Sequence, residues 1–167
     1  MDLHMHVHQG ERLPDWPAAA VAGLGAGAVL MVLELFWSAL VTGGSPWTTS
    51  HLIAAIVMGP DTLQSTDFNV MIVAVALVAH YVLGALFGLL LAAIIAPLHL
   101  DSTVGLVSAG AVFGACLYLL NFYGMAHFLP WFVEWRGAAT LITHLIFGVA
   151  AALFYWKLNR YGADRPS

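Results

Sequence analysis

Four polar side chains lie inside long apolar stretches of the chain, and their types could do chemistry. They are one carboxyl, one amide and two imidazoles, from Glu34, Asn121, His80 and His144. Ionisable residues within membrane-spanning segments are costly and are candidates for function by default. Three kinds of role are open to this set: a structural hydrogen-bond network, a haem or metal site, and a relay for protons, ions or quinols.

Each role assigns the residues differently. In the structural interpretation, Glu34 accepts a hydrogen bond from His80 or His144, and Asn121 completes a network that fixes the register of the helices. In the second, the two histidines ligate haem b, or join Glu34 in binding a divalent transition metal. In the third, a Glu34–histidine relay serves a small oligomeric transporter or proton channel. The sequence leaves all three open.

The spacing of these residues repeats along the chain. The first and third apolar stretches read Gly23-x3-Gly27-x6-Glu34 and Gly110-x3-Gly114-x6-Asn121, and the second and fourth read His80-x3-Gly84-x3-Gly88 and His144-x3-Gly148-x3-Ala152. At about 100° per residue, helix positions separated by four or eleven residues lie within about 40° of each other. The small residues are therefore predicted to form helix-packing faces, with the polar residues converging in the outer half of the membrane.

The composition identifies the solvent around these elements. Hydrophobic residues make up 61% of the 167 residues and charged residues only 8%. A soluble domain carries about 25% charged residues, so this chain is predicted to be a multi-pass membrane protein embedded in a lipid bilayer. A nucleic-acid partner is not expected, because there are five basic residues and they form no stripe.

Four stretches are long enough to cross a bilayer, which takes roughly 20 helical residues. We predict an all-α membrane protein built as two parallel-repeat hairpins, with spans at 17–41, 68–97, 103–124 and 137–157 inside a transmembrane domain at 17–157. A short interfacial helix is predicted at 48–58, in the first outer loop. The segments 1–16 and 158–167 are predicted to be cytoplasmic, because most Lys and Arg residues lie on the side of the termini.

The N-terminal segment contains alternating histidines, His4, His6 and His8. On an extended strand they face one side and could bind copper, nickel or zinc. A segment with pH-dependent charge is the simpler interpretation. The sequence shows no nucleophile elbow, phosphate-binding loop or soluble cofactor motif, so the protein is not expected to be an enzyme on its own.

The layout resembles a loose set of small, uncharacterised four-span bacterial inner-membrane proteins. The resemblance is carried by the glycine-rich first span, the His80 and His144 motifs, Gly110-x3-Gly114 and Phe128-Leu129-Pro130. It covers about residues 17 to 157. It implies a bacterial inner membrane and four spans, and it implies no activity.

The leading functional hypothesis is an accessory, non-catalytic subunit of a larger inner-membrane complex, of redox or respiratory type. Its basis is the near absence of extramembrane residues and the apolar outer connections, because exposed apolar surface marks a partner or membrane contact. The alternatives are a haem- or metal-binding protein using His80 and His144, and a small oligomeric transporter or proton channel using Glu34. Other membrane subunits or further copies of the chain are the expected partners.

Overall fold

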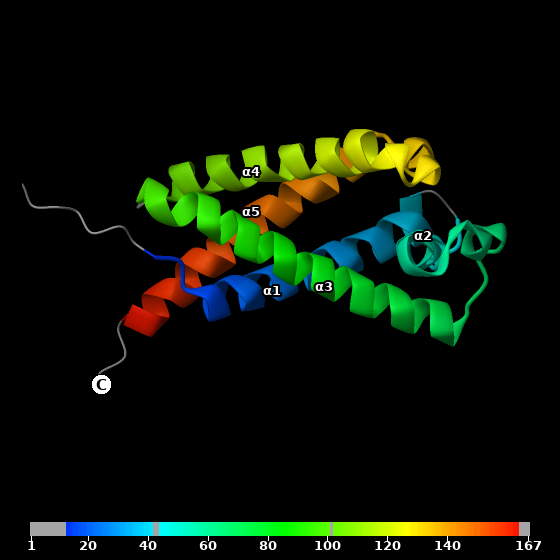
Figure 1. Cartoon of the computed structure of the whole chain (residues 1–167), viewed down its shortest axis with the longest axis horizontal. Helices are drawn as coiled ribbons and strands as arrows, with labels where there is room; N and C mark the ends of the chain where they lie inside the picture. The colour runs from blue at the N-terminus through cyan, green and yellow to red at the C-terminus, as the bar shows by residue number, and fades with distance from the viewer. Residues whose placement is uncertain (1–12, 42–43, 101, 164–167) are drawn as a thin grey trace, which may run out of the picture.

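The computed structural model describes residues 13–41, 44–100 and 102–163, and this part of the chain is built from helices and the turns between them. The α-helices are α1 (Trp16–Phe36), α2 (Thr48–Met58), α3 (Val70–Ile95), α4 (Thr103–Leu119) and α5 (Ala138–Ala163) (Figure 1). Short 3-10 segments follow α2, α3 and α4, and a π-helical turn extends α1 over Trp37–Val41 and α4 over Leu120–Gly124.

Within the residues that the structure describes, four segments are long and apolar enough to cross a membrane. They are Trp16–Leu40, Val70–Leu98, Thr103–His127 and Ala138–Arg160. The short helix α2 lies between the first two, as predicted. The all-α fold class with four spans is therefore confirmed. The span boundaries differ from the predicted ones by up to three residues. In addition, α5 continues as a helix to Ala163 and takes in part of the predicted tail.

Side-chain caps fix where three of the spans begin. An oxygen of Asp15 accepts a hydrogen bond from the Ala18 N–H at 3.0 Å, and Ser102 Oγ accepts one from the Gly105 N–H at 3.1 Å. Asn69 Oδ1 accepts from two N–H groups in the first turn of α3. These oxygens satisfy backbone donors that the first turn of a helix leaves without partners.

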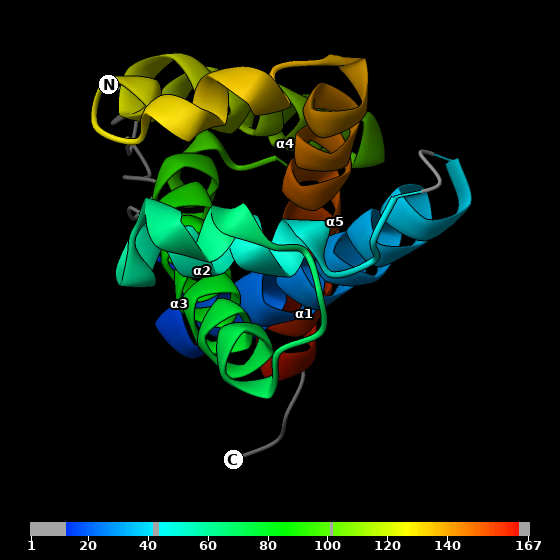
Figure 2. The same cartoon turned by 90° about the vertical axis from the view of Figure 1, so that its right-hand side faces the viewer.

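The spans run between two distinct ends of the molecule (Figure 1). The beginning of α1 and the end of α5 lie together at what we call the terminal end. At the opposite end, which we call the α2 end, α2 lies across the spans when the molecule is viewed from that side (Figure 2). Both ends of the transmembrane domain therefore lie on the same side, as an even number of spans requires.

Each hairpin is held by a crossing of glycine-lined helix faces. A Cβ atom added at Gly88 on α3 would lie 2.5 Å from the Ala19 carbonyl oxygen of α1. One added at Gly110 on α4 would lie 2.5 Å from the Gly148 carbonyl oxygen of α5. Only glycine lets backbones approach this closely. The same steric limit applies at Gly23, Gly84, Gly114 and Gly148, Gly27 lies against the His80 ring, and Ala152 is fully buried.

The two hairpins meet on one side and separate on the other. Helix α1 packs along α5 through a core that includes Ala22, Ala26, Phe147 and Ala151. A twofold repeat would pack α4 along α3 in the same way. Instead α3 and α4 diverge from the turn that joins them (Figure 1) and make little contact. The shared spacing thus produces two similar hairpins in an asymmetric bundle.

A buried histidine holds α2 to the segment that follows it. The His51 side chain is 2% exposed, with Nδ1 2.6 Å from the Thr62 carbonyl oxygen and Nε2 2.9 Å from the Asp67 carbonyl oxygen. On the other side of this end, Arg136 Nε donates to the Phe122 carbonyl oxygen at 2.7 Å, and its guanidinium lies over the Tyr123 ring. These contacts make the α2 end an ordered cap.

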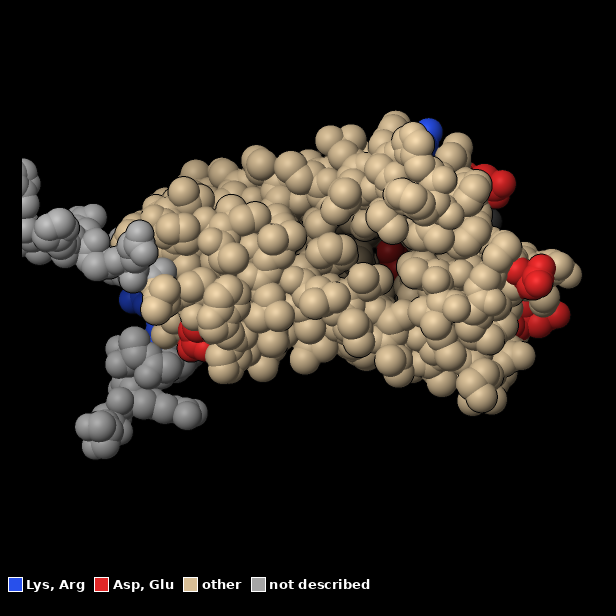
Figure 3. All heavy atoms as spheres, in the orientation of Figure 1, with Lys and Arg blue, Asp and Glu red and all other residues tan. Residues whose placement is uncertain are grey.

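Charged side chains gather at the two ends of the molecule (Figure 3). Asp61, Asp67, Glu134 and Arg136 belong to the α2 end, and Lys157 and Arg160 belong to the terminal end. The belt between the ends is uncharged on the face shown, except for acidic atoms at the bottom of a hollow. This distribution matches a polypeptide that crosses a hydrocarbon layer about 30 Å thick.

Candidate functional site

The four polar residues singled out in the spans lie on four different elements. Glu34 is in the last turn of α1, and Asn121 is in the π-helical turn that follows α4. At 1.5 Å per residue, His80 lies about 15 Å and His144 about 9 Å along their helices from the α2 end. All four therefore lie in the half of the spanning region nearer the α2 end.

These side chains line a single cavity of about 130 Å³, which we call the polar chamber. Apart from Thr49, its other lining residues have no polar side chain, and they come from all four spans, from α2 and from the segment after α4. They include Leu30, Leu52, Ile56, Leu83, Phe87, Leu117, Phe132 and Phe147. A water molecule takes about 30 Å³, so the chamber has room for about four waters. The structure thus brings the predicted cluster together around a small space that water can fill.

His80 is anchored to the helix that it faces. Its Nε2 lies 2.9 Å from the Gly27 carbonyl oxygen of α1 and donates a hydrogen bond to it. A Cβ added at Gly27 would lie 3.6 Å from the His80 ring, an ordinary van der Waals contact, so the ring packs directly against this part of α1. With Nε2 carrying the proton, Nδ1 of the neutral ring keeps its lone pair.

His144 and Asn121 form the second anchored pair. His144 Nδ1 donates to the Thr140 carbonyl oxygen at 2.8 Å, one turn back on α5. Its Nε2 then accepts a hydrogen bond from the Asn121 amide at 3.3 Å. The rings of Tyr118 and Phe122 lie edge-on to the imidazole and restrict its rotation. Asn121 and His144 occupy the positions in the repeat that Glu34 and His80 occupy in the first hairpin. The second hairpin therefore has a side-chain hydrogen bond at this position, between Asn121 and His144, and the first hairpin has none between Glu34 and His80.

Glu34 makes no side-chain hydrogen bond or ion pair with any other residue that the structure describes. The predicted hydrogen bond from His80 or His144 to Glu34 is therefore wrong. Both histidines bond to backbone carbonyls instead: His80 to the Gly27 carbonyl oxygen on the facing helix α1, and His144 to the Thr140 carbonyl oxygen one turn back on its own helix. Glu34 is left with its carboxyl group facing the cavity.

Glu34 also lines a second, larger cavity of about 500 Å³, which we call the vestibule. The vestibule lies at the α2 end, and its wall contains the side chains of Ser38, Thr48, Glu134 and Arg136. Thr49, Leu52 and Phe122 line both spaces. Glu34 thus lies at the boundary between the polar chamber and a vestibule that contains one further acidic and one basic side chain, Glu134 and Arg136.

The chamber is closed toward the terminal end. Phe87 and Phe147 form part of its wall, with their rings in an edge-to-face contact at 6.5 Å between centroids. Beyond them lies the apolar core that contains Leu91, Leu106 and Phe113. Any polar path from the vestibule therefore ends at these side chains in this conformation.

The size of the chamber and the spacing of its side chains argue against the haem and metal hypotheses. Pockets for larger organic ligands usually measure about 300–1,000 Å³, so haem b between His80 and His144 would need the helices to move apart. Across residues 13–41, 44–100 and 102–163, no three His, Cys, Asp or Glu side chains gather closely enough to hold a metal ion. The set Glu34, His80 and His144 does not meet this condition.

Other histidines have different positions. His4, His6 and His8 lie outside the described residues, so the metal site proposed for them has no structural counterpart here. His127 is exposed, and its Nδ1 bonds to carbonyl oxygens of its own turn. The role of His51 in the cap could not be read from the sequence, because both of its partners are backbone atoms of an irregular segment.

The fold and the polar chamber define the chain as a multi-pass membrane protein with a small polar cavity inside its transmembrane domain. Comparison with protein-family models, with curated proteins and with solved structures finds no match. The functional argument therefore depends on the geometry of the chamber.

Proposed function

We propose that this protein is a small proton-binding transporter, with Glu34 as the residue that exchanges protons. The observation that carries the proposal is the position of Glu34 between the vestibule and the chamber that holds His80, Asn121 and His144. A carboxyl group without a protein partner can gain or lose a proton without breaking a structural bond. Intramembrane Glu–His sets of this kind occur in the proton relays of pumps and transporters.

The two imidazoles support the assignment to protons. Each donates one N–H to a backbone carbonyl, from His80 to Gly27 and from His144 to Thr140. The neutral His80 ring therefore keeps Nδ1 as a nitrogen that can accept a proton, whereas Nε2 of His144 already accepts the Asn121 amide N–H. A dehydrated metal cation would need several ligands at once, whereas a proton needs one acceptor and a short water chain. The chamber offers such acceptors and room for about four waters.

Access from one end only favours a carrier over an open channel. The vestibule reaches Glu34 from the α2 end, and Phe87 and Phe147 close the chamber below it. A carrier exposes its site to one side at a time, and its binding site lies between packed repeats. On this proposal the structure corresponds to the state that is open toward the α2 end, and rearrangement of the hairpins would open the other side.

We also propose that the transporter is an oligomer. A hollow between α3, α4 and α2 has acidic atoms at its bottom (Figure 3), and Glu34 is the one acidic residue that lines the chamber. An acidic group that faces lipid is costly. A neighbouring chain seated over the gap between α3 and α4 would cover it.

For location, we propose a bacterial inner membrane with the terminal end in the cytoplasm. Lys157 and Arg160 lie at that end, and Arg12 and Arg165 flank the spans there in the sequence, against Arg136 at the α2 end. The excess of basic residues follows the positive-inside rule. The vestibule then opens toward the outside.

A flux measurement on proteoliposomes tests the proposal. Purified protein is reconstituted with a pH-sensitive dye inside, and proton entry is followed after a K⁺ diffusion potential is imposed. We expect proton entry well above that of empty liposomes, and entry at the empty-liposome level for Glu34→Gln. Glu134→Gln is the matched control, because Glu134 lines the vestibule but not the chamber. It should behave like the wild-type protein.

Two results would count against the proposal. One is wild-type flux no higher than that of empty liposomes, and the other is equal flux for Glu34→Gln and Glu134→Gln. Both variants must show the wild-type thermal midpoint in detergent, so that a loss of flux is not a loss of folding.

The second candidate function is an accessory, non-catalytic subunit of a larger, redox or respiratory, inner-membrane complex. The gap between α3 and α4 favours it as well, because another protein could cover the hollow. The segment Met125–Trp135 adds exposed apolar surface, with Phe128 77% exposed. Mass measurement after gentle solubilisation separates the two candidates: a complex of identical chains fits the transporter, and a co-purifying different chain fits the subunit.

A further inference from the structure

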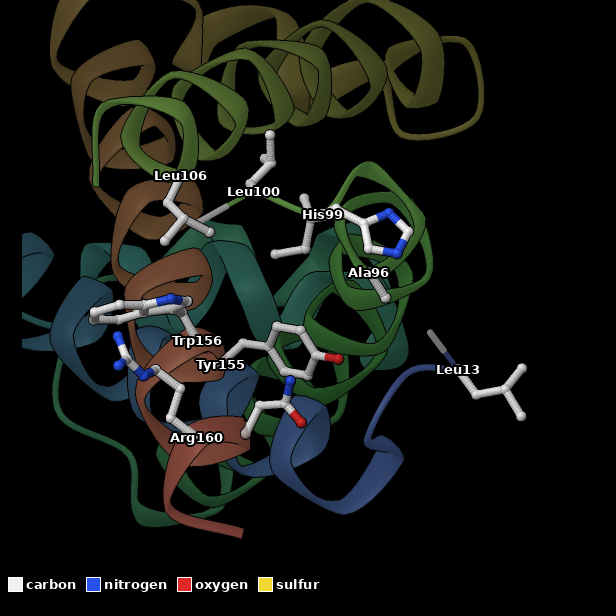
Figure 4. A pocket seen from close by; sticks show the side chains of 10 residues that line it. Leu13, Ala96, His99, Leu100, Leu106, Tyr155, Trp156 and Arg160 are labelled. Atoms are coloured by element: carbon white, nitrogen blue, oxygen red, sulfur yellow. The ribbon is translucent and has the colours of Figure 1, made fainter. Parts of the chain in front are cut away.

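A third pocket lies at the terminal end, at the opposite end of the spans from the polar chamber. Figure 4 shows the side chains that line it. It measures about 430 Å³ and is formed between the end of α3, the start of α4 and the last turns of α5. We call it the terminal pocket. Its lining residues on these elements are Ile95, Leu100, Leu106, Tyr155, Trp156 and Arg160, with His99 in the turn and Asn159 on α5.

The terminal pocket lies at the depth of lipid headgroups. Along α5, Trp156 lies about 27 Å from Ala138 at 1.5 Å per residue, and the hydrocarbon core is about 30 Å thick. Trp and Tyr side chains are enriched at this boundary. Trp156 and Tyr155 therefore mark the position where phosphate groups of the bilayer are found.

Arg160 supplies the positive charge of the pocket. Its guanidinium lies 4.7 Å from the centre of the Trp156 ring, a cation–π contact that holds it at the pocket edge. Figure 4 shows it against Trp156, with His99 on the opposite side. It forms no ion pair with any described carboxylate. Near the pocket, Asp15 uses its carboxylate to cap α1, accepting from Ala18.

The pocket has two chemically different parts. Ile95, Leu100 and Leu106 give it an apolar wall, whereas Asn159 and Arg160 give it hydrogen-bond donors and a cation. His99 Nδ1 already donates to the Pro97 carbonyl oxygen. An acyl chain fits the first part, and a phosphate ester fits the second. Arginine suits phosphate because its planar group can donate two parallel hydrogen bonds. Basic pockets between spans on the cytoplasmic side are known to bind anionic lipid headgroups.

We propose that the terminal pocket binds the headgroup of an anionic phospholipid, with Arg160 as its phosphate ligand. The bound lipid would contact the end of α3, the turn before α4 and the last turns of α5 together. This site is independent of the proposed proton transport, so each proposal can fail alone.

Native mass spectrometry of the detergent-purified protein tests this inference. The protein is incubated with phosphatidylglycerol, or with phosphatidylcholine of the same acyl chains, and the retained lipids are counted. We expect preferential retention of phosphatidylglycerol, lowered about fivefold by Arg160→Gln, because one basic residue near a membrane contributes about 1 kcal/mol. Lys157→Gln is the matched control, since Lys157 is one turn earlier on α5 but does not line the pocket. It should retain nearly as much lipid as the wild-type protein.

A third sample identifies the source of the phosphate. Excess inorganic phosphate should leave the bound lipid in place, because the acyl chain contributes to binding. The proposal is overturned if inorganic phosphate displaces the lipid, if phosphatidylcholine is retained equally, or if Arg160→Gln and Lys157→Gln lower retention to the same extent. Arg160 is exposed near the end of α5, so its substitution leaves the helical core intact.

Discussion

At the scale of single residues, backbone carbonyls decide what the buried histidines do. His80, His144 and His51 all form hydrogen bonds to backbone carbonyl oxygens, and none of them forms a hydrogen bond to a described carboxylate. His51 differs from the others because both of its ring nitrogens face carbonyl oxygens.

We expect His51→Ala to destabilise the α2 end. The substitution removes a buried side chain whose ring nitrogens lie 2.6 Å from the Thr62 carbonyl oxygen and 2.9 Å from the Asp67 carbonyl oxygen. The predicted loss is about 1–3 kcal/mol in the free energy of unfolding, measured by reversible denaturation in mixed micelles. His127→Ala is the control, because His127 is exposed and bonds only within its own turn. An equal effect of both substitutions would contradict the role given to His51.

The position of Glu34 could be predicted at this scale, but its partners could not. A carboxyl group eleven residues after Gly23 must share its helix face, because both follow the period of the α-helix. Which group it meets depends on the neighbouring helices. The Gly27 carbonyl oxygen accepts the hydrogen bond from His80, so the expected hydrogen bond from His80 to Glu34 does not form.

At the scale of elements, the glycine crossings set the distance between helices in each hairpin. The spacing of small residues predicted these faces, because membrane helices approach most closely where side chains are small. The structure adds which backbone atoms meet. At Gly110 the nearest atoms of α5 are the Gly148 carbonyl oxygen and the Val149 Cα, and neither can rotate away as a side chain could.

Gly110→Ala is therefore expected to force α4 and α5 apart. Overpacking of this kind costs about 1–3 kcal/mol, and the loss should appear as a lower thermal midpoint in detergent. Gly137→Ala is the matched control, because a Cβ at Gly137 meets no atom within 4 Å. If Gly110→Ala unfolds at the same temperature as Gly137→Ala, the close crossing of α4 and α5 is not what holds the second hairpin.

At the scale of the whole molecule, the two similar hairpins form an asymmetric bundle. Helix α1 packs along α5, but its repeat-related counterpart, the contact of α4 with α3, is nearly absent. This opening leaves the hollow that leads toward an acidic side chain (Figure 3). The bundle therefore has a closed side and an open side, and the open side is where a neighbouring chain or lipid must lie.

The orientation of the bundle is also testable at this scale. In a Cys116→Ser background, Gln64→Cys lies exposed at the α2 end and Asn159→Cys lies exposed near the terminal end. With the termini in the cytoplasm, a membrane-impermeant maleimide should label Gln64→Cys in intact cells and Asn159→Cys only after permeabilisation. The reverse pattern would contradict the proposed orientation and place the vestibule on the cytoplasmic side.

The sequence alone determined the number of spans, the common side of the two ends, the small-residue faces, and the depth of Glu34, His80, Asn121 and His144. Hydrophobicity and the helical period fix these properties locally, whatever the helices pack against. Only the tertiary structure decided the opening between α3 and α4, the carbonyl partners of the histidines, and the two cavities that meet at Glu34. These depend on the tilt and rotation of each helix against its neighbours, which two hairpins with the same spacing do not share.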